Sequence, residues 1–349
     1  MNKRVRLGGM GAFCLLCVII LLLGMSLGSS GIGLNTTASV ILEKLTGLQT
    51  GAAPDKAQAA IVWELRVPRA LLAFLVGAAL AVSGVITQSV LRNPLASPYT
   101  MGVSAGSSLS AALYMAVGVL LPVAGRLGLP FAGFVGGLVT ILLVMLLASA
   151  MDKLLSVHTL ILTGIVFSLF ISAVLTVILV LFRENLQQVL LWQMGSFAMR
   201  GWTYPAVMLP FLLVGLVIAL AFSKEMDILA FGEQAAMSVG VSTVSVKWIL
   251  LLVSAFLAGA AVSLSGIIGF VDLIAPHMAR KLFGPEHKVL IPMSALCGGA
   301  LMVLSDLAAR TVLPPLELPV GAVTALIGAP FFAGLFLRNH KRQGKGKAC

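Results

Sequence analysis

The chain is dominated by long apolar runs, and its charged residues fall in short segments between them. A charge at the centre of a bilayer costs about 2.5–3.5 kcal/mol, so long charge-free windows mark candidate membrane spans. Nine such windows occur, at residues 7–42, 70–91, 93–125, 127–151, 154–182, 201–223, 248–271, 289–305 and 318–337. Each window can hold one membrane helix of about 20 residues.

Both ends of the chain are basic, and this changes the expected number of spans. The basic residues are Lys3, Arg4 and Arg6 at the start and Arg338, Lys341, Arg342, Lys345 and Lys347 at the end. Because basic segments flanking membrane helices stay in the cytoplasm, both termini are expected there, which requires an even number of spans. We therefore expect a tenth, short helix at 268–281, interrupted by Asp272.

The pattern predicts an all-α polytopic membrane protein, with residues 1–349 forming a single transmembrane domain of about ten helices. The longest inner loop is 224–246. The expected spans lie near residues 11–31, 69–91, 99–118, 129–151, 157–182, 203–222, 247–266, 268–281, 289–305 and 318–337.

Composition agrees with a membrane protein and excludes several other classes. Of the 349 residues, 59% are hydrophobic and 10% charged, and the mean hydropathy is +1.08. A soluble domain carries about 25% charged residues. The net charge of +11 fits membrane orientation better than nucleic-acid binding, because no basic face with stacking aromatics accompanies it. Cys14 and Cys17 lie inside an apolar run, where small apolar packing is expected rather than metal binding.

Two stretches resemble each other and point towards transport. Residues 76–84 and 258–266 match at five of nine positions, and Pro94 and Pro276 keep the same offset of 182. Helices five spans apart have opposite orientations, so the pair predicts an inverted repeat of the kind that builds many transporters. The G-x-x-x-G pairs Gly102/Gly106 and Gly133/Gly137 predict close helix packing.

The energy source is not given by these patterns. No G-x-x-x-x-G-K-[ST] phosphate loop occurs, so an ATPase would have to be a separate chain. An ion-coupled secondary transporter of a small metabolite stays an alternative, with Asp272 and Asp306 as its candidate ionisable residues. A membrane-embedded enzyme would need clustered acids, His or Ser, whereas the 12 acids are scattered.

Several distinctive segments occur in order from about residue 60 to 337. They are Arg66-Val-Pro-Arg69, Ser83-Gly84 through Asn93-Pro94-Leu95-Ala96-Ser97-Pro98, Met101 to Gly106, Phe231 to Ala236 with Gly240, Ser265 to Arg280, and Ser305-Asp306 through Pro330. Together they resemble the FecCD-type permease family of ABC importers, which carry iron–siderophores, haem or cobalamin. Asp272 departs from the pattern that the resemblance implies, which has glycine there, and its role stays open.

The resemblance implies roles for three groups of residues and no catalytic residue in this chain. Arg66, Arg69 and Arg310 would dock an extracytoplasmic substrate-binding protein through acidic residues of that partner. Gly232, Glu233, Ala236 and Gly240 would belong to coupling helices that contact the ATPase, with the glycines breaking the loop into short helices. The inner constriction would be formed by Asn93, Leu95, Val157 and His158.

The resemblance also implies the partners and the location. Two copies of a cytoplasmic ATPase and a second permease copy, in a homodimer or heterodimer, would complete the transporter in the cell membrane. No cofactor and no metal site are expected, since His277 has only Asp272 near ligand spacing. The substrate stays open between a ferric siderophore, haem and cobalamin.

Overall fold

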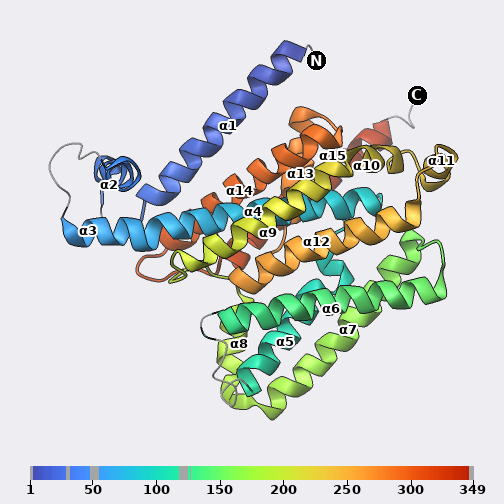
Figure 1. Cartoon of the computed structure of the whole chain (residues 1–349), viewed down its shortest axis with the longest axis horizontal. Helices are drawn as coiled ribbons and strands as arrows, with labels where there is room; N and C mark the ends of the chain where they lie inside the picture. The colour runs from blue at the N-terminus through green and yellow to red at the C-terminus, as the bar shows by residue number, and fades with distance from the viewer. Residues whose placement is uncertain (1–2, 29–31, 48–54, 118–124, 126, 346–349) are drawn as a thin grey trace.

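In the computed structural model the chain is a bundle of helices (Figure 1). The structure describes residues 3–28, 32–47, 55–117, 125 and 127–345, and within these ranges it contains no strand. Residues 29–31 of the first expected span and 118 of the third lie outside the described residues, as do Lys347 and Cys349.

The helices follow the apolar windows of the sequence. In chain order they are α1 Lys3–Ser26, α2 Leu34–Thr46, α3 Lys56–Ala60, η1 Ile61–Arg66, α4 Val67–Val90, η2 Pro98–Met101, α5 Val103–Val117, α6 Gly128–Met151, α7 Val157–Leu181, η5 Arg183–Asn185, α8 Leu186–Gln193, α9 Thr203–Ala221, α10 Ser223–Leu229, α11 Glu233–Ser238, α12 Thr243–Ser265, α13 Val271–Phe283, α14 His287–Thr311 and α15 Val320–Lys345.

Seven helical segments of the described chain are long and apolar enough to cross a membrane. They are Gly8–Ser26, Lys56–Val90, Gly128–Met151, Val157–Leu181, Thr203–Ala221, Thr243–Ser265 and His287–Thr311. Val103–Val117 and Val320–Gly334 are shorter apolar helices. A helix, α13, also covers the stretch where the tenth span is expected. The fold is therefore all-helical and typical of a polytopic membrane protein, while the count of ten spans stays a prediction.

Helix α4 lies at the centre of the bundle, in contact with α9, α12, α13 and α14. Its buried residues occur all round the helix, which is typical of a helix enclosed by other helices rather than one facing lipid. Its polar side chains have partners: the hydroxyls of Ser83 and Thr87 lie 2.9 and 2.6 Å from the Ser254 hydroxyl of α12. This pairing satisfies hydroxyl groups that would otherwise be costly to bury.

Glycines allow the closest helix crossings. A Cβ atom at Gly77 of α4 would collide with the carbonyl oxygen of Gly298 on α14, and one at Gly298 would collide with that of Gly77. On the other side of the bundle, a Cβ at Gly106 of α5 would stand 2.5 Å from the Gly136 carbonyl oxygen of α6. The close packing predicted for the G-x-x-x-G pair that contains Gly106 is confirmed.

The two stretches of the predicted repeat lie on α4 and α12, which pack against each other. They run antiparallel, because the end of α4 meets the beginning of α12: Arg92, just after α4, and Lys247, near the beginning of α12, both pair with Glu233. Opposite directions are what an inverted repeat requires, and the repeat itself stays a prediction.

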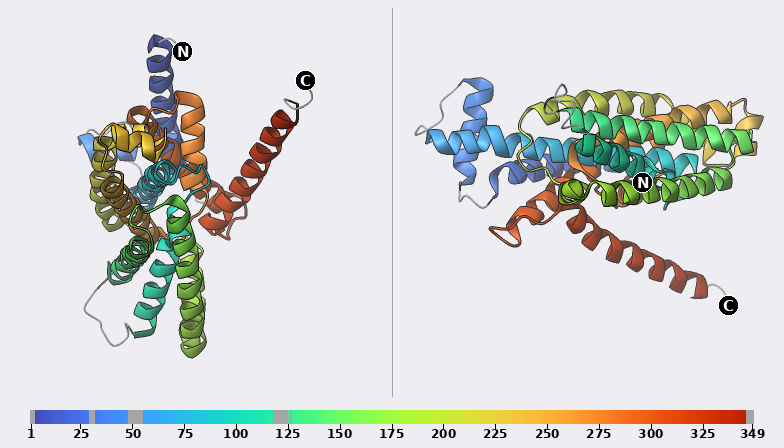
Figure 2. Two further views of the ribbon diagram at one scale, coloured as in Figure 1. Left: turned by 90° about the vertical axis from the view of Figure 1, so that its right-hand side faces the viewer. Right: turned by 90° about the horizontal axis from the view of Figure 1, so that it is seen from below.

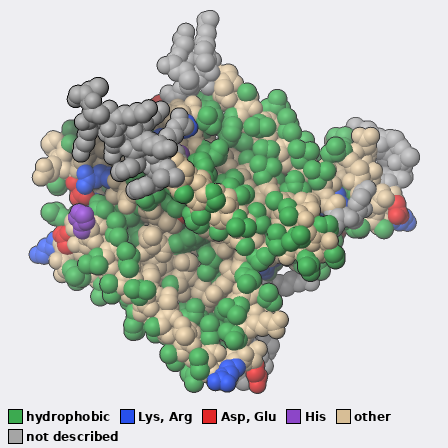
Figure 3. All heavy atoms as spheres, turned by 180° about the vertical axis from the view of Figure 1, so that it is seen from behind, with side chains coloured by type: hydrophobic (Ala, Val, Ile, Leu, Met, Phe, Trp, Pro, Cys, Tyr) green, Lys and Arg blue, Asp and Glu red, His purple; other side chains and the backbone are tan. Residues whose placement is uncertain are grey.

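The surface of the molecule is rich in apolar side chains (Figure 3). Helix α7 exposes Leu162, Val166, Leu169, Phe170 and Leu181, each by more than half. Helix α15 projects away from the rest of the bundle (Figure 2). A soluble monomer rarely exposes contiguous apolar areas of this extent, so these faces fit contact with lipid or with another membrane helix.

Candidate functional site

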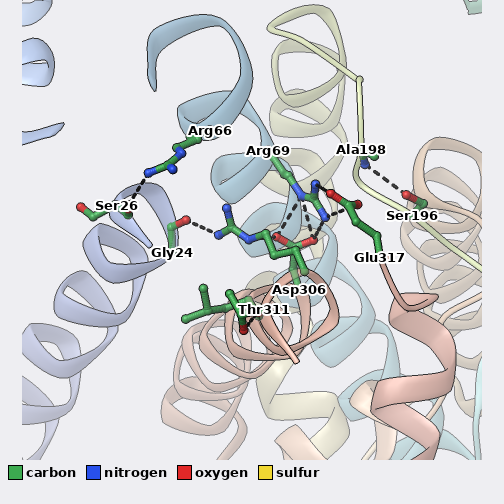
Figure 4. A network of polar contacts seen from close by, with 11 residues as sticks. Gly24, Ser26, Arg66, Arg69, Ser196, Ala198, Asp306, Thr311 and Glu317 are labelled. Carbon is green, nitrogen blue, oxygen red and sulfur yellow. Dashed lines mark hydrogen bonds and ion pairs between the residues drawn. The ribbon is translucent and has the colours of Figure 1, made fainter. Parts of the chain in front are cut away.

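One end of α4 carries a cluster of charged residues, which we call the arginine cluster: Arg66, Arg69, Asp306, Arg310 and Glu317 (Figure 4). Arg69 donates from Nε and Nη2 to Asp306 Oδ1 at 3.0 and 2.9 Å. Its Nη1 and Nη2 also donate to Glu317 Oε1 and Oε2 at 2.9 and 3.0 Å. This fork geometry joins α4 to α14 and to the segment before α15, and such bidentate pairs are the strong ones.

The other two arginines of the cluster hold the end of α1. Arg66 Nη1 donates to the carbonyl oxygen of Ser26 (Figure 4), and Arg310 Nη2 donates to that of Gly24. The last carbonyls of a helix have no partner within the helix, so the arginines cap α1. Both are buried, at 5% and 7% exposure. Docking of a substrate-binding protein was expected of these arginines and stays a prediction; within the chain, Arg66 and Arg310 are engaged with α1.

The arginine cluster nevertheless borders a cavity of about 310 Å³. Three guanidinium groups face two carboxylates in the cluster, so its formal charge is +1. The charged residues lining the cavity are Arg66, Arg69, Arg310 and Glu317. The cavity therefore offers a positively charged environment to an acidic side chain of a partner.

The second polar region lies at the other end of α4. A helix of 24 residues is roughly 36 Å long, which exceeds the hydrocarbon thickness of a bilayer. The regions at its two ends can therefore face opposite sides of a membrane. Figure 1 also shows that the beginning of α1 and the end of α15 lie towards this second end, where α10 and α11 are found.

The loop expected to contact the ATPase folds into the short helices α10 and α11. Gly232 has φ +118° and Gly240 has φ +86°, a region that favours glycine. Gly232 precedes α11 and Gly240 follows it, so the helix breaks predicted at both glycines are confirmed. Ala236 is buried against the bundle, whereas Phe231 is 85% exposed.

Glu233, the first residue of α11, is bound from two directions. Its Oε2 lies 2.7 Å from Lys247 Nζ, and its Oε1 lies 3.7 Å from Arg92 Nη2. Lys247 is completely buried and also donates to the carbonyl oxygens of Leu154 and Leu155, at 3.0 and 2.8 Å. We call these five residues the Glu233 cluster.

The residues expected to form the inner constriction lie beside the Glu233 cluster. A cavity of about 570 Å³ is lined by Val157, His158, Gly232 and Glu233, among others. Asn93 lines a neighbouring cavity of about 500 Å³. The Asn93 side chain accepts the Leu95 amide at 2.9 Å, which closes a local turn, and Leu95 is 52% exposed.

The sequence did not reveal a second connection, between α10, α14 and α4. Asp227 Oδ1 lies 2.6 Å from His287 Nδ1, and His287 Nε2 lies 2.5 Å from the Ser89 hydroxyl. His287 is 60 positions from Asp227 and 198 positions from Ser89 in the chain, so no local spacing brings them together. The available signal was a histidine at a helix start and an aspartate in the 224–246 loop, which is too common a combination to identify a pair.

Asp272 is buried at the start of α13 and accepts a hydrogen bond from the Ser97 hydroxyl. A Cβ at Gly84 of α4 would collide with the Asp272 carbonyl oxygen, so the two backbones touch. Among the residues that the structure describes, no three His, Cys, Asp or Glu side chains come together as a metal site.

Comparison with known proteins identifies the family. The model of the FecCD transport family matches residues 16–338. The uncharacterized ABC transporter permease protein YvrB of Bacillus subtilis is 40% identical over 323 residues, covering 93% of this chain and 91% of that protein. The Fe(3+) dicitrate transport system permease protein FecD of Escherichia coli is 38% identical over 278 residues, covering 80% of this chain and 85% of that protein.

Relatives and solved structures agree with this result. The hemin transport system permease protein HmuU of Yersinia pestis is 35% identical, covering 98% of this chain and 99% of that protein. A metal-chelate type ABC transporter solved in an inward-facing conformation superposes with a TM-score of 0.81 at 31% identity, covering 97% of this chain and all of that one. The chain therefore belongs to the FecCD transport family, whose members are permease subunits of ABC transporters and leave ATP hydrolysis to separate subunits.

Proposed function

We propose that this chain is the permease subunit of an ABC importer that takes up an iron–siderophore complex handed over by a substrate-binding protein. The observation that carries the proposal is the placement of two different polar regions at opposite ends of α4. One borders a positively charged cavity, and the other carries short helices suited to contact a partner. Relatives named for iron(3+) citrate and iron(3+)-hydroxamate import support an iron–siderophore, while haem and cobalamin are the alternative substrates.

The arginine cluster is the proposed docking site for the binding protein. Arg66, Arg69 and Arg310 face the cavity, and an acidic side chain entering it would compete with Glu317, which is 46% exposed, for Arg69. Rim charges of this kind steer association and fix the register of a complex more than they add affinity.

The coupling helices are the proposed contact with two ATPase subunits in the cytoplasm. Phe231 projects from the α10–α11 corner with 85% of its surface exposed, and an exposed aromatic anchor is typical of a protein interface. Gly232, Glu233, Ala236 and Gly240 set the shape of this corner. ATP binding would move it, and the movement would reach Asn93, Leu95, Val157 and His158 at the inner constriction.

A second permease copy is proposed to cover the apolar faces of α7 and α15, with the substrate passing between the copies. Both termini are then cytoplasmic, on the same side as α10 and α11. The wall of such a path has to be apolar, because a passing ligand must not be held.

The test is uptake of labelled ferric siderophore by proteoliposomes that contain this chain with its ATPase and binding protein. Uptake that requires ATP is the expected result. ATPase stimulation without ferric siderophore uptake would move the substrate to haem or cobalamin. Uptake driven by an ion gradient without ATP would replace the proposal with a secondary transporter.

A further inference from the structure

Lys247 is a completely buried lysine with every donor of its ammonium group engaged. The three acceptors are the carbonyl oxygens of Leu154 and Leu155 and a carboxylate oxygen of Glu233, at 3.0, 2.8 and 2.7 Å. An ammonium group has three N–H donors, so this arrangement saturates it. The three acceptors come from two segments, the α6–α7 loop and α11. Along the chain these two segments are separated by all the elements from α7 to α10.

The α6–α7 loop that Lys247 holds is a rigid turn. Asp152 accepts the amides of Leu154 and Ser156, each at 2.9 Å. Leu155 has φ +51°, a strained value for a leucine, and its side chain is fully buried. The turn leads directly into Val157 and His158 at the start of α7. A displacement of the Leu154 and Leu155 carbonyl groups would therefore also displace these two residues.

Glu233 reaches the other half of the inner constriction as well. Its second oxygen pairs with Arg92 at 3.7 Å, and Arg92 has a left-handed backbone with φ +44° immediately before Asn93. One carboxylate at the start of the coupling helix is therefore connected to both loops that border the proposed constriction.

We propose that Lys247 is a positioning residue that links the coupling helix α11, through Glu233, to the turn before Val157, so that α11 and this turn move as one unit. The inference rests on the proposed function, in which α11 is displaced by the ATPase. Without Lys247 the ATPase still binds and hydrolyses ATP, but the movement no longer reaches Val157 and His158.

Three variants in the assembled transporter test this role. Lys247→Met removes the ammonium group at similar side-chain length, and Glu233→Gln keeps a hydrogen-bond acceptor but removes the charge. Lys288→Met, at an exposed lysine at the start of α14, is the matched control. The readouts are the affinity for the ATPase, the basal rate of ATP hydrolysis, and the substrate transported per ATP hydrolysed.

The expected result for Lys247→Met is a fall of about tenfold in substrate transported per ATP, the factor that corresponds to losing one charged hydrogen bond. ATPase affinity and basal hydrolysis stay at the control values. Glu233→Gln lowers the ratio in the same direction, and the fall in the double variant is smaller than the product of the two single falls, because both single substitutions break the Lys247–Glu233 contact. A transport ratio equal to that of Lys288→Met overturns the inference.

A distance measurement keeps the inference testable if Lys247→Met fails to assemble. Spin labels at Gln234 and Lys153, both exposed, report the separation of α11 from the turn in a background without the native cysteines. The distance between the two labels is expected to be the same in the ATP-free and ATP-bound states of the otherwise native chain. In Glu233→Gln the distribution of this distance is expected to broaden. A distance that changes on ATP binding in the native chain overturns the inference. Failure of ATP-dependent uptake by the native transporter would instead refute the proposed function.

Discussion

At the scale of single residues, the buried polar side chains of this protein have specific partners from distant parts of the chain. Arg69 binds Asp306 across 237 positions, and Lys247 binds Leu155 across 92. A buried charge without a partner is costly, so composition indicates that partners must exist. Which residues they are depends on how the helices pack.

Asp152 provides a pH-dependent test of the turn before α7. Hydrogen bonds from the Ser156 side chain and from the backbone amides of Ser156 and Leu154 lower the pKa of Asp152 from 3.8 to about 2. A lowered pKa means that the turn is stabilised above about pH 4 and loses this contribution as the pH falls through about 2. We expect exchange protection of the Leu154 and Ser156 amides, measured by hydrogen exchange, to be constant above pH 4 and to fall below it. In Asp152→Ala, which removes both acceptor oxygens, the protection is low at every pH; unchanged protection in this variant would contradict the assignment.

The crossing of α4 and α14 provides a packing test. Gly77→Ala places a methyl group against the Gly298 carbonyl oxygen and is expected to destabilise the protein by about 1–3 kcal/mol. Gly11→Ala in α1 is the control, because a Cβ there meets no atom within 4 Å. Thermal unfolding of the detergent-solubilised protein measures both, and equal midpoints for the two variants would refute the close crossing.

At the scale of helices, charged side chains determine which elements are held together at each end of α4. Arg69 joins α4 to α14, and Arg66 and Arg310 hold the end of α1. At the other end, Lys247 and His287 join the short helices α11 and α10 to the bundle. Apolar packing alone allows helices to slide along one another, whereas these directional bonds set their positions.

Removing Arg69 tests this role. Arg69→Met leaves the Asp306 carboxylate, which is 1% exposed, without its bidentate partner, and the expected destabilisation is about 3–5 kcal/mol. Adding Asp306→Asn removes the buried charge and is expected to restore part of the lost stability, as a double-mutant cycle in thermal unfolding measures. Arg183→Met, at an exposed arginine, should stay within about 0.5 kcal/mol of the native protein. A double variant less stable than Arg69→Met would argue against the pair.

At the scale of the whole molecule, the two polar regions are separated by the length of α4, and the apolar helix surfaces lie between them. This arrangement suits a subunit that receives a partner on each side of a membrane. It also means that the charge of the arginine cluster acts on one side alone, because salt screens a charge beyond about 8–10 Å.

Glu317→Gln tests docking at the arginine cluster without breaking the contacts of Arg66 and Arg310. The substitution raises the formal charge of the cluster from +1 to +2. An acidic docking surface is then expected to associate faster, with an increase that is largest at low salt. Association of the purified binding protein with the permease in nanodiscs, followed at several salt concentrations, measures this. Glu184→Gln, at an exposed glutamate of η5, is the control, and an equal rate in both variants would place the docking surface elsewhere.

The helical class of the fold follows from the sequence alone, because the charge-free windows and the mean hydropathy of +1.08 leave few alternatives to membrane helices. The breaks at Gly232 and Gly240 could also be predicted, since each depends on the backbone preferences of a few neighbouring residues. The candidate site residues came from the resemblance to a family, and their roles stay predictions.

The partners of the charged residues could be found only in the tertiary structure. The resemblance implied docking for Arg66 and Arg310, and nothing local in the sequence indicated that they also cap the end of α1, where packing of α1 on α4 and α14 brings its unpaired carbonyls to them. Lys247 stands at the start of an expected span, 247–266, with no partner indicated by the sequence, whereas in the structure it is completely buried and connects α11 to the α6–α7 turn. Apolar periodicity acts over a few residues and can be read locally, whereas the pairing of buried charges depends on contacts between segments that only the packed bundle brings together.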